Sequence, residues 1–319
     1  MKSFSVLYDI IEKELADLSY PSNSKSLYDP IRYVLNIGGK RIRPILSLLS
    51  HQLFSDNIDS TLKAAIGIEI FHNFTLIHDD IMDKAPLRRG LQTVHKKWDN
   101  NSAILCGDTM LVQAFDFISQ VDNKNLRMVL DVFNKAAIKV CEGQNWDMNF
   151  EQRQDVTISE YLKMIEYKTS VLLAASLQIG AINGGACIDQ QDHLYKFGKN
   201  IGIAFQLKDD FLDAFGDPEI FGKQLGGDIK SNKKTYLYLK ALEISNRSQK
   251  KELVNLFSEQ SENKVNQVKS IFKDLKIEDY TSNLINDYYT QAMSHLNAID
   301  SDKKEPLIQF AQKTKERVS

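Results

Sequence analysis

The sequence has few cysteines, and those it has form no recognisable pair. Cys106, Cys141 and Cys187 are the three thiols among 319 residues. An odd number without the spacing of paired metal ligands indicates neither a disulfide framework nor a metal site. We therefore expect three reduced thiols in the core of a cytoplasmic protein.

The sequence also lacks an excess of charge of either sign. It has 40 Lys and Arg against 42 Asp and Glu, which gives a formal net charge of -2. A chain so nearly neutral has no overall field that would favour nucleic acid or a membrane surface. Any site for an anion must therefore be built locally.

Long apolar runs and targeting signals are missing as well. The longest apolar stretch, residues 171–182, is interrupted by Ser176, Gln178 and Gly180 and is too short to span a bilayer, so it predicts a core helix. No signal peptide is recognisable at the N-terminus, because acidic residues appear from Asp9 onward. We expect a cytoplasmic location and no stable membrane insertion.

Proline is scarce too, and the 6 prolines lie near expected helix starts or turns. Between them apolar residues recur every three or four positions, as in residues 45–53 and 126–140, and no segment shows the alternation of a half-buried strand. No linker or low-complexity tract divides the chain. These patterns predict an all-α protein of roughly a dozen helices, folded as a single domain over residues 1–319.

Two acidic motifs of the same pattern are the most informative feature of the sequence. Residues 79–83 and 209–213 both have the pattern Asp-Asp-x-x-Asp, follow an apolar segment, and precede a helix-ending residue, Pro86 or Gly216. A single acidic run is usually a solvated helix end. Two matching runs favour Mg²⁺, which binds one or two carboxylates together with phosphate oxygens. We expect the two motifs to face each other across a helical bundle and to hold a diphosphate through metal ions.

A basic motif at residues 38–44 begins with two glycines. Exposed backbone N–H groups, a helix N-terminus and three cations together suit an anion. Lys40 and Arg43 lie three positions apart and are expected to face one pocket, with Arg41 facing elsewhere. A glycine cap at the end of a helix, followed by an ordinary basic turn, is the alternative.

The segment from Thr61 to Asp83 is apolar on nearly all sides, which predicts a central helix. His72 lies two turns before Asp79 on nearly the same face, so it is a candidate donor to an anion. On an apolar helix the alternative is a core histidine. Glu69 and His72 also match the Glu-x-x-His of di-iron bundles, but that fold needs a second copy, which the sequence lacks.

Further polar residues accompany each acidic motif. Arg88 and Arg89 come just after the first motif, where they could neutralise the charge that remains on a metal-bound diphosphate. Lys168 and Thr169 interrupt a later apolar helix. The residues that flank the second motif are Gln206, Lys223 and Lys233. Each is weak evidence alone, because basic residues are common on surfaces, and their order along the chain is the stronger evidence.

With these motifs in this order, the sequence resembles the trans-isoprenyl diphosphate synthases of the polyprenyl synthetase family. The resemblance covers roughly residues 30–240 and is carried by GGKRIRP (38–44), FHNFTLIHDDIMD (71–83), PLRRG (86–90), EGQNWD (142–147), YKTS (167–170), FQLKDDFLDAFGD (205–217) and FGKQLGGDIK (221–230). It implies an all-α isoprenoid synthase fold, normally a homodimer. It also implies an Mg²⁺-dependent, head-to-tail condensation of isopentenyl diphosphate with dimethylallyl, geranyl or farnesyl diphosphate.

The resemblance further implies a role for each matching residue. Three Mg²⁺ ions per site are expected on Asp79, Asp80, Asp83, Asp209 and Asp213, with Asp210 in support. The allylic diphosphate is expected on Arg88, Lys168, Thr169, Gln206, Lys223 and Lys233, of which Lys168 and Lys223 also act in catalysis beside the aspartates. Isopentenyl diphosphate is expected on Lys40, Arg43, His72 and Arg89. No protein base is evident, so the departing diphosphate is the expected proton acceptor.

Product length is expected to depend on the central helix. A prenyl chain held at Asp79 would extend back along it, past the small Thr75, toward Phe74 and then Phe71, which lies about 12 Å further down. The sequence has an aromatic residue five positions before the motif, none four positions before it, and no insertion within it. This combination resembles the pattern of geranylgeranyl diphosphate synthases. It predicts a C20 product, with C15 as the alternative. Both phenylalanines could instead be ordinary core residues.

Two other functions fit parts of the sequence. A class I terpene cyclase shares the first acidic motif but would carry a different metal motif in place of the second. A non-catalytic subunit of a two-chain synthase would typically have lost one motif. Both motifs are complete here, which favours the synthase.

Overall fold

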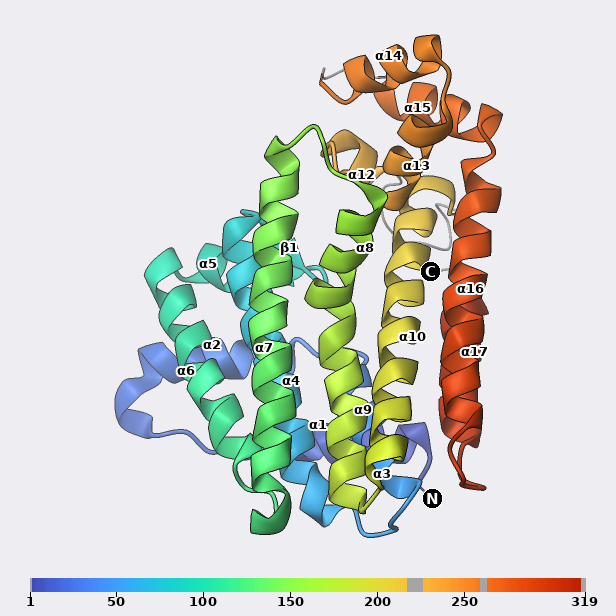
Figure 1. Cartoon of the computed structure of the whole chain (residues 1–319). Coiled ribbons are helices and arrows are strands. Elements are labelled where there is room, and N and C mark those ends of the chain that lie inside the picture. The colour runs from blue at the N-terminus through green and yellow to red at the C-terminus, as the bar shows by residue number, and fades with distance from the viewer. Residues whose placement is uncertain (1, 217–225, 259–262, 317–319) are drawn as a thin grey trace. The chain divides into compact units, whose positions relative to one another are not determined.

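The structure is a computed structural model that describes residues 2–216, 226–258 and 263–316. Within these ranges the chain is helical apart from one small hairpin (Figure 1). Backbone packing divides the chain into two compact units, which we describe separately. The first unit comprises Met1–Lys135, Ala175–Tyr195 and Asp300–Leu307, and the second comprises Ala136–Ala174, Lys196–Ile299 and Ile308–Ser319. The single domain expected from the sequence stays a prediction.

The elements that lie wholly in the first unit come at the start of the chain. They are α1 (Phe4–Ala16), a 3-10 turn η1 (Ser22–Ser24), α2 (Lys25–Asn36), α3 (Ile42–Gln52), α4 (Asp59–Met82), β1 (Leu87–Arg88), β2 (Leu91–Gln92), α5 (Val94–Lys97) and α6 (Asn100–Ile118). The helices with residues in both units are α7 (Asn123–Gln152), α9 (Val171–Gly184), α10 (Ile188–Phe215) and α17 (Glu305–Glu316).

The second unit contains shorter helices as well as one irregular turn. They are α8 (Ile158–Ile165), a π-helical turn η2 (Glu166–Ser170), α12 (Gly227–Lys230), α13 (Tyr236–Ile244), α14 (Arg247–Leu256), α15 (Lys264–Asp274) and α16 (Ile277–Asn297). The later part of α10 packs with α8, α13, α15 and α16 around one apolar core. α16 and the end of α17 lie side by side (Figure 1), and the Lys315 ammonium is 4.7 Å from the centre of the Tyr289 ring.

α4 is the central element of the first unit and is buried along most of its length. It packs against α3 and α6. Gly67 permits the close approach of α6, because a Cβ atom at this position would lie 2.9 Å from the carbonyl oxygen of Ala114. The central helix predicted for residues 61–83 is confirmed, with bounds Asp59–Met82, and it ends within the first acidic motif.

One expectation about the backbone is wrong in detail. Pro30 lies inside α2 rather than at a helix start. It is tolerated there because only the carbonyl of Ser26, in the first turn, loses its helical partner. The all-α prediction is confirmed, although residues 87–92, just past the first acidic motif, form a small antiparallel hairpin of two-residue strands.

The expectation of three core cysteines is also wrong. Cys106 is buried on α6, but Cys141 and Cys187 are exposed. Val140 points into the core, and the next position along a helix is rotated toward the surface, which explains the exposure of Cys141. Across the described ranges, none of the helices combines the length and apolar character that crossing a bilayer requires.

Candidate active site

The first acidic motif marks the end of α4. Asp83 caps the helix, and its backbone N–H donates to the carbonyl of Asp79 at 2.8 Å. The chain then turns back through Lys84, which has a left-handed backbone with φ of 52°, and the Ala85 N–H donates to the carbonyl of Asp80 at 3.0 Å. This turn places the following hairpin beside the motif.

Arg88, on the hairpin, binds the middle carboxylate of the motif. Its Nε donates to both oxygens of Asp80, at 3.0 and 2.9 Å, and its Nη2 donates to Oδ1 at 2.8 Å. The same nitrogen lies 3.8 Å from Asp79 Oδ2. Burial raises the pKa of Asp80, and the hydrogen bonds and charge of Arg88 oppose this increase. Arg88 therefore offsets the charge of Asp80, which accepts hydrogen bonds on both oxygens.

The basic motif at residues 38–44 holds Arg41 apart from Arg43. Arg41 is buried and reaches away from the site, donating to Glu12 Oε1 at 2.6 Å, to Glu69 Oε1 at 2.8 Å and to the Leu35 carbonyl at 2.6 Å. Lys40 is exposed. Arg41 is thus a structural anchor for the loop that carries its two neighbours.

Arg43 lies beside His72 on α4, with Nη1 3.1 Å from the imidazole Nε2. Its Nε is buried and has no hydrogen-bond partner in the part of the chain that the structure describes. Burial holds the pKa of His72 well below its usual value, and the charges of Arg43 and Arg89 add to this effect. His72 is therefore neutral at pH 7, and Arg43 retains an unused donor.

Arg89 completes this group from the hairpin. Its guanidinium lies against Gly39, where an added Cβ atom would be only 2.8 Å from Arg89 Nη1. The structure thus brings Arg43, His72 and Arg89 together around the glycine loop, as predicted. The buried Nε of Arg43 would gain a partner from a bound anion, and a buried donor left without one is costly.

The residues predicted to limit product length lie one to two turns before the motif on α4. Phe71 is fully buried and packs edge-on against Phe133, with ring centres 5.2 Å apart. Phe74 contacts Phe71 and His78, at ring-centre distances of 5.4 and 4.8 Å. The hydroxyl of Thr75 donates a hydrogen bond to the backbone carbonyl of His72 in the same helix. Phe71 and Phe74 therefore belong to an aromatic cluster.

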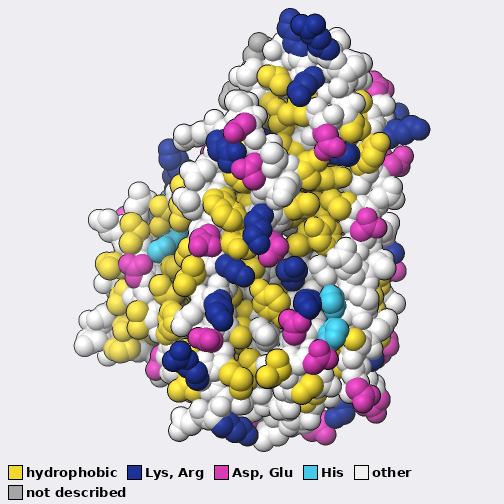
Figure 2. Space-filling model, in the orientation of Figure 1, with side chains coloured by type: hydrophobic (Ala, Val, Ile, Leu, Met, Phe, Trp, Pro, Cys, Tyr) yellow, Lys and Arg dark blue, Asp and Glu magenta, His cyan; other side chains and the backbone are white. Residues whose placement is uncertain are grey.

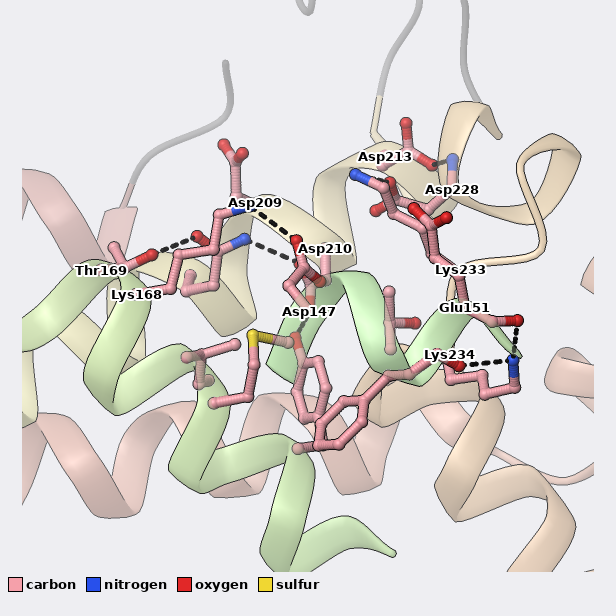
Figure 3. A pocket seen from close by; sticks show the side chains of 16 residues that line it. Asp147, Glu151, Lys168, Thr169, Asp209, Asp210, Asp213, Asp228, Lys233 and Lys234 are labelled. Atoms are coloured by element: carbon pink, nitrogen blue, oxygen red, sulfur yellow. Dashed lines mark hydrogen bonds and ion pairs between the residues drawn. The ribbon is translucent and has the colours of Figure 1, made fainter. Parts of the chain in front are cut away.

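A cavity of about 270 Å³ in the second unit contains the second acidic motif (Figure 3). The predicted site residues that line it are Lys168, Thr169, Gln206, Asp209, Asp210, Asp213 and Lys233. Lys223 lies outside the described residues. Three further lining residues, Asp147, Tyr161 and Asp228, were given no role from the sequence.

Both carboxylate oxygens of Asp210 accept hydrogen bonds from neutral side chains. Gln206 Nε2 donates to its Oδ1 at 3.0 Å, and the hydroxyl of Tyr161 donates to its Oδ2. The Gln206 amide oxygen in turn accepts from the Thr169 hydroxyl at 3.2 Å. Burial, together with the charge of Asp228, raises the pKa of Asp210 to about 7.

Asp213 and Asp228 connect the motif to α12. The two oxygens of Asp213 accept from the backbone N–H groups of Gly227, at 3.1 Å, and Asp228, at 3.0 Å. The carboxylate of Asp228 lies 3.5 Å from Lys233 Nζ. Burial raises the pKa of Asp228, whereas Lys233 lowers it. This arrangement fixes Asp213 and draws Lys233 toward the acidic wall of the cavity.

Lys168 and Thr169 are carried by the π-helical turn η2. Lys168 Nζ donates to Asp147 Oδ2 at 2.6 Å. Single π turns inside α-helices are frequent at functional sites, because the extra residue changes which side chains face a cavity. Asp147 and Asp228 each lie in a motif quoted above. Tyr161 had no such signal, because it is 49 residues from the carboxylate it binds.

The aspartates of the two motifs could hold Mg²⁺ only together with a ligand that supplies further oxygen atoms. Within the described ranges, no three His, Cys, Asp or Glu side chains converge to hold a metal by themselves. Mg²⁺ does not require such a cage, because it takes one or two carboxylates and completes its shell with phosphate oxygens and water. The all-oxygen aspartate donors fit this hard ion.

Comparison with known proteins identifies the chain. Residues 24–275 match the model of the polyprenyl synthetase family. The chain belongs to this family. The prediction of a prenyl-transferring enzyme with the isoprenoid synthase fold is confirmed. Members of the family bind isoprenyl diphosphates with the help of metal ions.

Individual family members agree along most of the chain. A geranylgeranyl diphosphate synthase of Methanosarcina mazei is 44% identical over 76% of this chain and 75% of its own length. A geranylfarnesyl diphosphate synthase of Natronomonas pharaonis is 39% identical over 73% of this chain and 74% of its own. The crystal structure of a geranylgeranyl pyrophosphate synthase matches with a TM-score of 0.94 and 42% identity, covering 100% of both chains.

Proposed function

We propose that the chain condenses isopentenyl diphosphate with an allylic diphosphate, head to tail, to give mainly geranylgeranyl diphosphate. The observation that carries this proposal is that both acidic motifs are complete and that each has its own cations. Arg88, Arg43 and Arg89 gather in the first unit. Lys168 and Lys233 line the cavity of the second. A reaction between two diphosphates requires two such sets of cations.

Isopentenyl diphosphate binds to Arg43, His72 and Arg89, with Lys40 at the exposed side. The buried, unused Nε of Arg43 supports this assignment, because an anion would give it a partner. Neutral His72 donates a hydrogen bond without adding a further buried charge. Binding the diphosphate here orients the double bond of isopentenyl diphosphate for attack on the allylic carbon.

The allylic diphosphate binds to Lys168, Thr169, Gln206 and Lys233, with Arg88 and Lys223 as further ligands. Three Mg²⁺ ions bound to Asp79, Asp80, Asp83, Asp209 and Asp213 would neutralise the charge that develops on the leaving diphosphate. Lys168 is held ready by Asp147 and can exchange this carboxylate for a phosphate oxygen. Both motifs are therefore needed for the same chemical step.

The chemistry begins when the allylic carbon–oxygen bond breaks. Its electron pair leaves with the diphosphate, and the double bond of isopentenyl diphosphate attacks the allylic cation to form the new carbon–carbon bond. The departing diphosphate then takes the proton whose loss restores a double bond. The chain's own task is to position both substrates and to surround the cation with apolar walls that exclude water.

The product is limited to C20 by the aromatic cluster on α4. Thr75 lets the growing chain pass, and Phe74 and Phe71 stop it one to two turns further down. The contact of Phe71 with Phe133 supports this role, because a ring packed against a second ring resists displacement. The relatives named above make C20 and C25 products, according to their names.

A second copy of the chain is the proposed partner. Large apolar side chains are exposed on α6, among them Leu105 and Val112, at 58% and 70% exposure. Hydrophobic side chains also gather over the α5 and α6 region at the left of Figure 2. A helix exposed in this way is suited to isologous packing in a homodimer. Light scattering should give a mass near twice 36.4 kDa, and a monomer mass would contradict the proposal.

The proposed function is tested with labelled isopentenyl diphosphate, an allylic primer and Mg²⁺. Asp79→Ala and Asp209→Ala should each lower turnover by at least about 100-fold, because both remove stabilisation of the leaving group. Asp287→Ala, which removes an exposed aspartate of α16, is the matched control and should keep full activity. Near wild-type turnover in either variant at saturating substrate and Mg²⁺ would show that its motif is not needed.

A further inference from the structure

We propose that Tyr161 is a positioning residue for the second acidic motif, acting through Asp210. The inference deepens the proposed function and rests on it, since it concerns the same allylic diphosphate. Tyr161 lies on α8, is 3% exposed and lines the cavity of the second unit. Its hydroxyl is aimed at the middle carboxylate of the motif and donates to Oδ2.

The carboxylate of Asp210 is fixed in place by contacts within the protein. One oxygen accepts from Tyr161 and the other from Gln206, so both are occupied by donors of the protein. Asp210 is itself buried, at 6% exposure. A carboxylate held in this way serves as a fixed support for the side chains around it. Tyr161 is one of its two hydrogen-bond donors among the described residues.

The support extends from Asp210 to the residues that meet the substrate. Gln206 donates to Asp210 with its amide nitrogen and accepts from the Thr169 hydroxyl with its amide oxygen. The bonds therefore run from α8 to α10 and on to the π-helical turn that carries Lys168 (Figure 3). Networks of this kind couple side chains that do not touch one another.

Loss of the Tyr161 hydroxyl should disturb the site without removing a group that touches the substrate. Asp210 would keep only the Gln206 donor, while Asp209, Asp213 and Asp228 line the same cavity. A buried carboxylate short of a donor is costly, so it should rotate toward another positive group or draw Gln206 with it. Either movement misplaces Thr169 and Lys168 for the diphosphate.

The test compares Tyr161→Phe with Tyr238→Phe, which alters another buried tyrosine of the second unit that does not line this cavity. Tyr161→Phe should lower kcat by about tenfold, because a hydrogen bond to a charged group is lost. The Mg²⁺ concentration for half-maximal rate should rise several-fold, and the KM for isopentenyl diphosphate should stay within about twofold of wild type. Tyr238→Phe should change none of these.

A second readout does not depend on turnover. Calorimetry with inorganic diphosphate and Mg²⁺, at a temperature where both proteins are folded, should show about tenfold weaker binding to Tyr161→Phe than to wild type. In an Asp210→Ala background the same tyrosine change should have almost no further effect, because its partner is gone.

Three outcomes would overturn the positioning role. They are equal diphosphate binding by wild type and Tyr161→Phe, binding absent from both, and effects of the Tyr161 and Asp210 changes that simply add. Failure of the proposed function is recognised separately, by a wild-type protein that binds diphosphate but forms no condensation product.

Discussion

Arg41 and Arg43 are two positions apart, and their surroundings give them different tasks. Arg41 satisfies its guanidinium on Glu12, Glu69 and a backbone carbonyl. Arg43 contacts His72 and keeps a buried nitrogen for a ligand. The first arginine therefore stabilises the fold, and the second is the one that we propose binds an anion.

The two arginines should respond differently to truncation. Arg43→Ala should raise the KM for isopentenyl diphosphate about tenfold, and more than the KM for the allylic primer, because a charge-assisted hydrogen bond is worth roughly 1.5–3 kcal/mol. Arg41→Ala should instead lower the free energy of unfolding by roughly 3–5 kcal/mol, since it leaves Glu69 buried without its partner. Steady-state kinetics and denaturant unfolding measure the two effects. Equal changes in both KM values for Arg43→Ala would contradict separate binding sites.

His72 predicts a pH dependence whose sign follows from its surroundings. Burial and the nearby arginines hold the pKa of folded His72 well below 6.5, so the unfolded chain binds a proton at this residue more readily. Its contribution to stability is therefore present above pH 6.5 and is lost as the pH falls. When the pH is lowered from about 7.5 to about 5.5 without ligands, the free energy of unfolding should fall less for His72→Gln than for wild type. An identical loss in both proteins would refute this assignment.

At the scale of the element, the π-helical turn explains how two consecutive residues serve one cavity. It packs closely against glycines on two neighbouring helices. A Cβ atom at Gly143 of α7 would lie 2.3 Å from the Lys168 backbone nitrogen, and one at Gly202 of α10 would lie 2.7 Å from Ser170. These glycines leave room for the wider turn.

Gly143→Ala should therefore displace the turn and weaken the allylic site. The KM for the allylic primer should rise about tenfold or more, because even a shift of about 1 Å disrupts positioned groups. Gly184→Ala is the matched control: its Cβ atom would meet the His51 carbonyl at 2.8 Å, so it should lower the melting temperature without changing this KM. If both variants lose stability and neither changes the KM, the turn has no special part in binding.

The helices and the acidic motifs could be predicted from the sequence because both depend on local spacing. The apolar character of residues 61–83 predicted α4 almost to its ends. The direction of Arg41 instead follows from its left-handed backbone, with φ of 46°, just before α3. Contacts that depend on an irregular turn could not be predicted in this way. The binding of Asp80 by Arg88 depends on the left-handed turn at Lys84.

At the scale of the whole molecule, the proposed reaction uses residues of both compact units. Asp79, Asp83 and the proposed isopentenyl diphosphate cations belong to the first unit, and Asp209 and the cavity around it belong to the second. The association of Tyr161 with Asp210 also depends on how distant segments of the second unit pack. A periodic pattern reveals which side of a helix is buried, but it does not identify the partner in another helix.

The aromatic cluster on α4 is the proposed limit on product length. Phe71→Ala or Phe74→Ala should lengthen the product beyond C20, because either change removes a ring from the proposed floor. Phe197→Ala, which removes a fully buried ring from α10, is the matched control and should lower stability without lengthening the product. No lengthening in either α4 variant would refute the floor.

Product chromatography of the wild-type protein tests the central claim most directly. The protein is incubated with labelled isopentenyl diphosphate, Mg²⁺ and dimethylallyl, geranyl or farnesyl diphosphate, and the products are dephosphorylated and separated by chain length. We predict geranylgeraniol as the main alcohol from every primer that is accepted. A product that stops at C15, a cyclic hydrocarbon, or no incorporation of label with any primer would contradict the account.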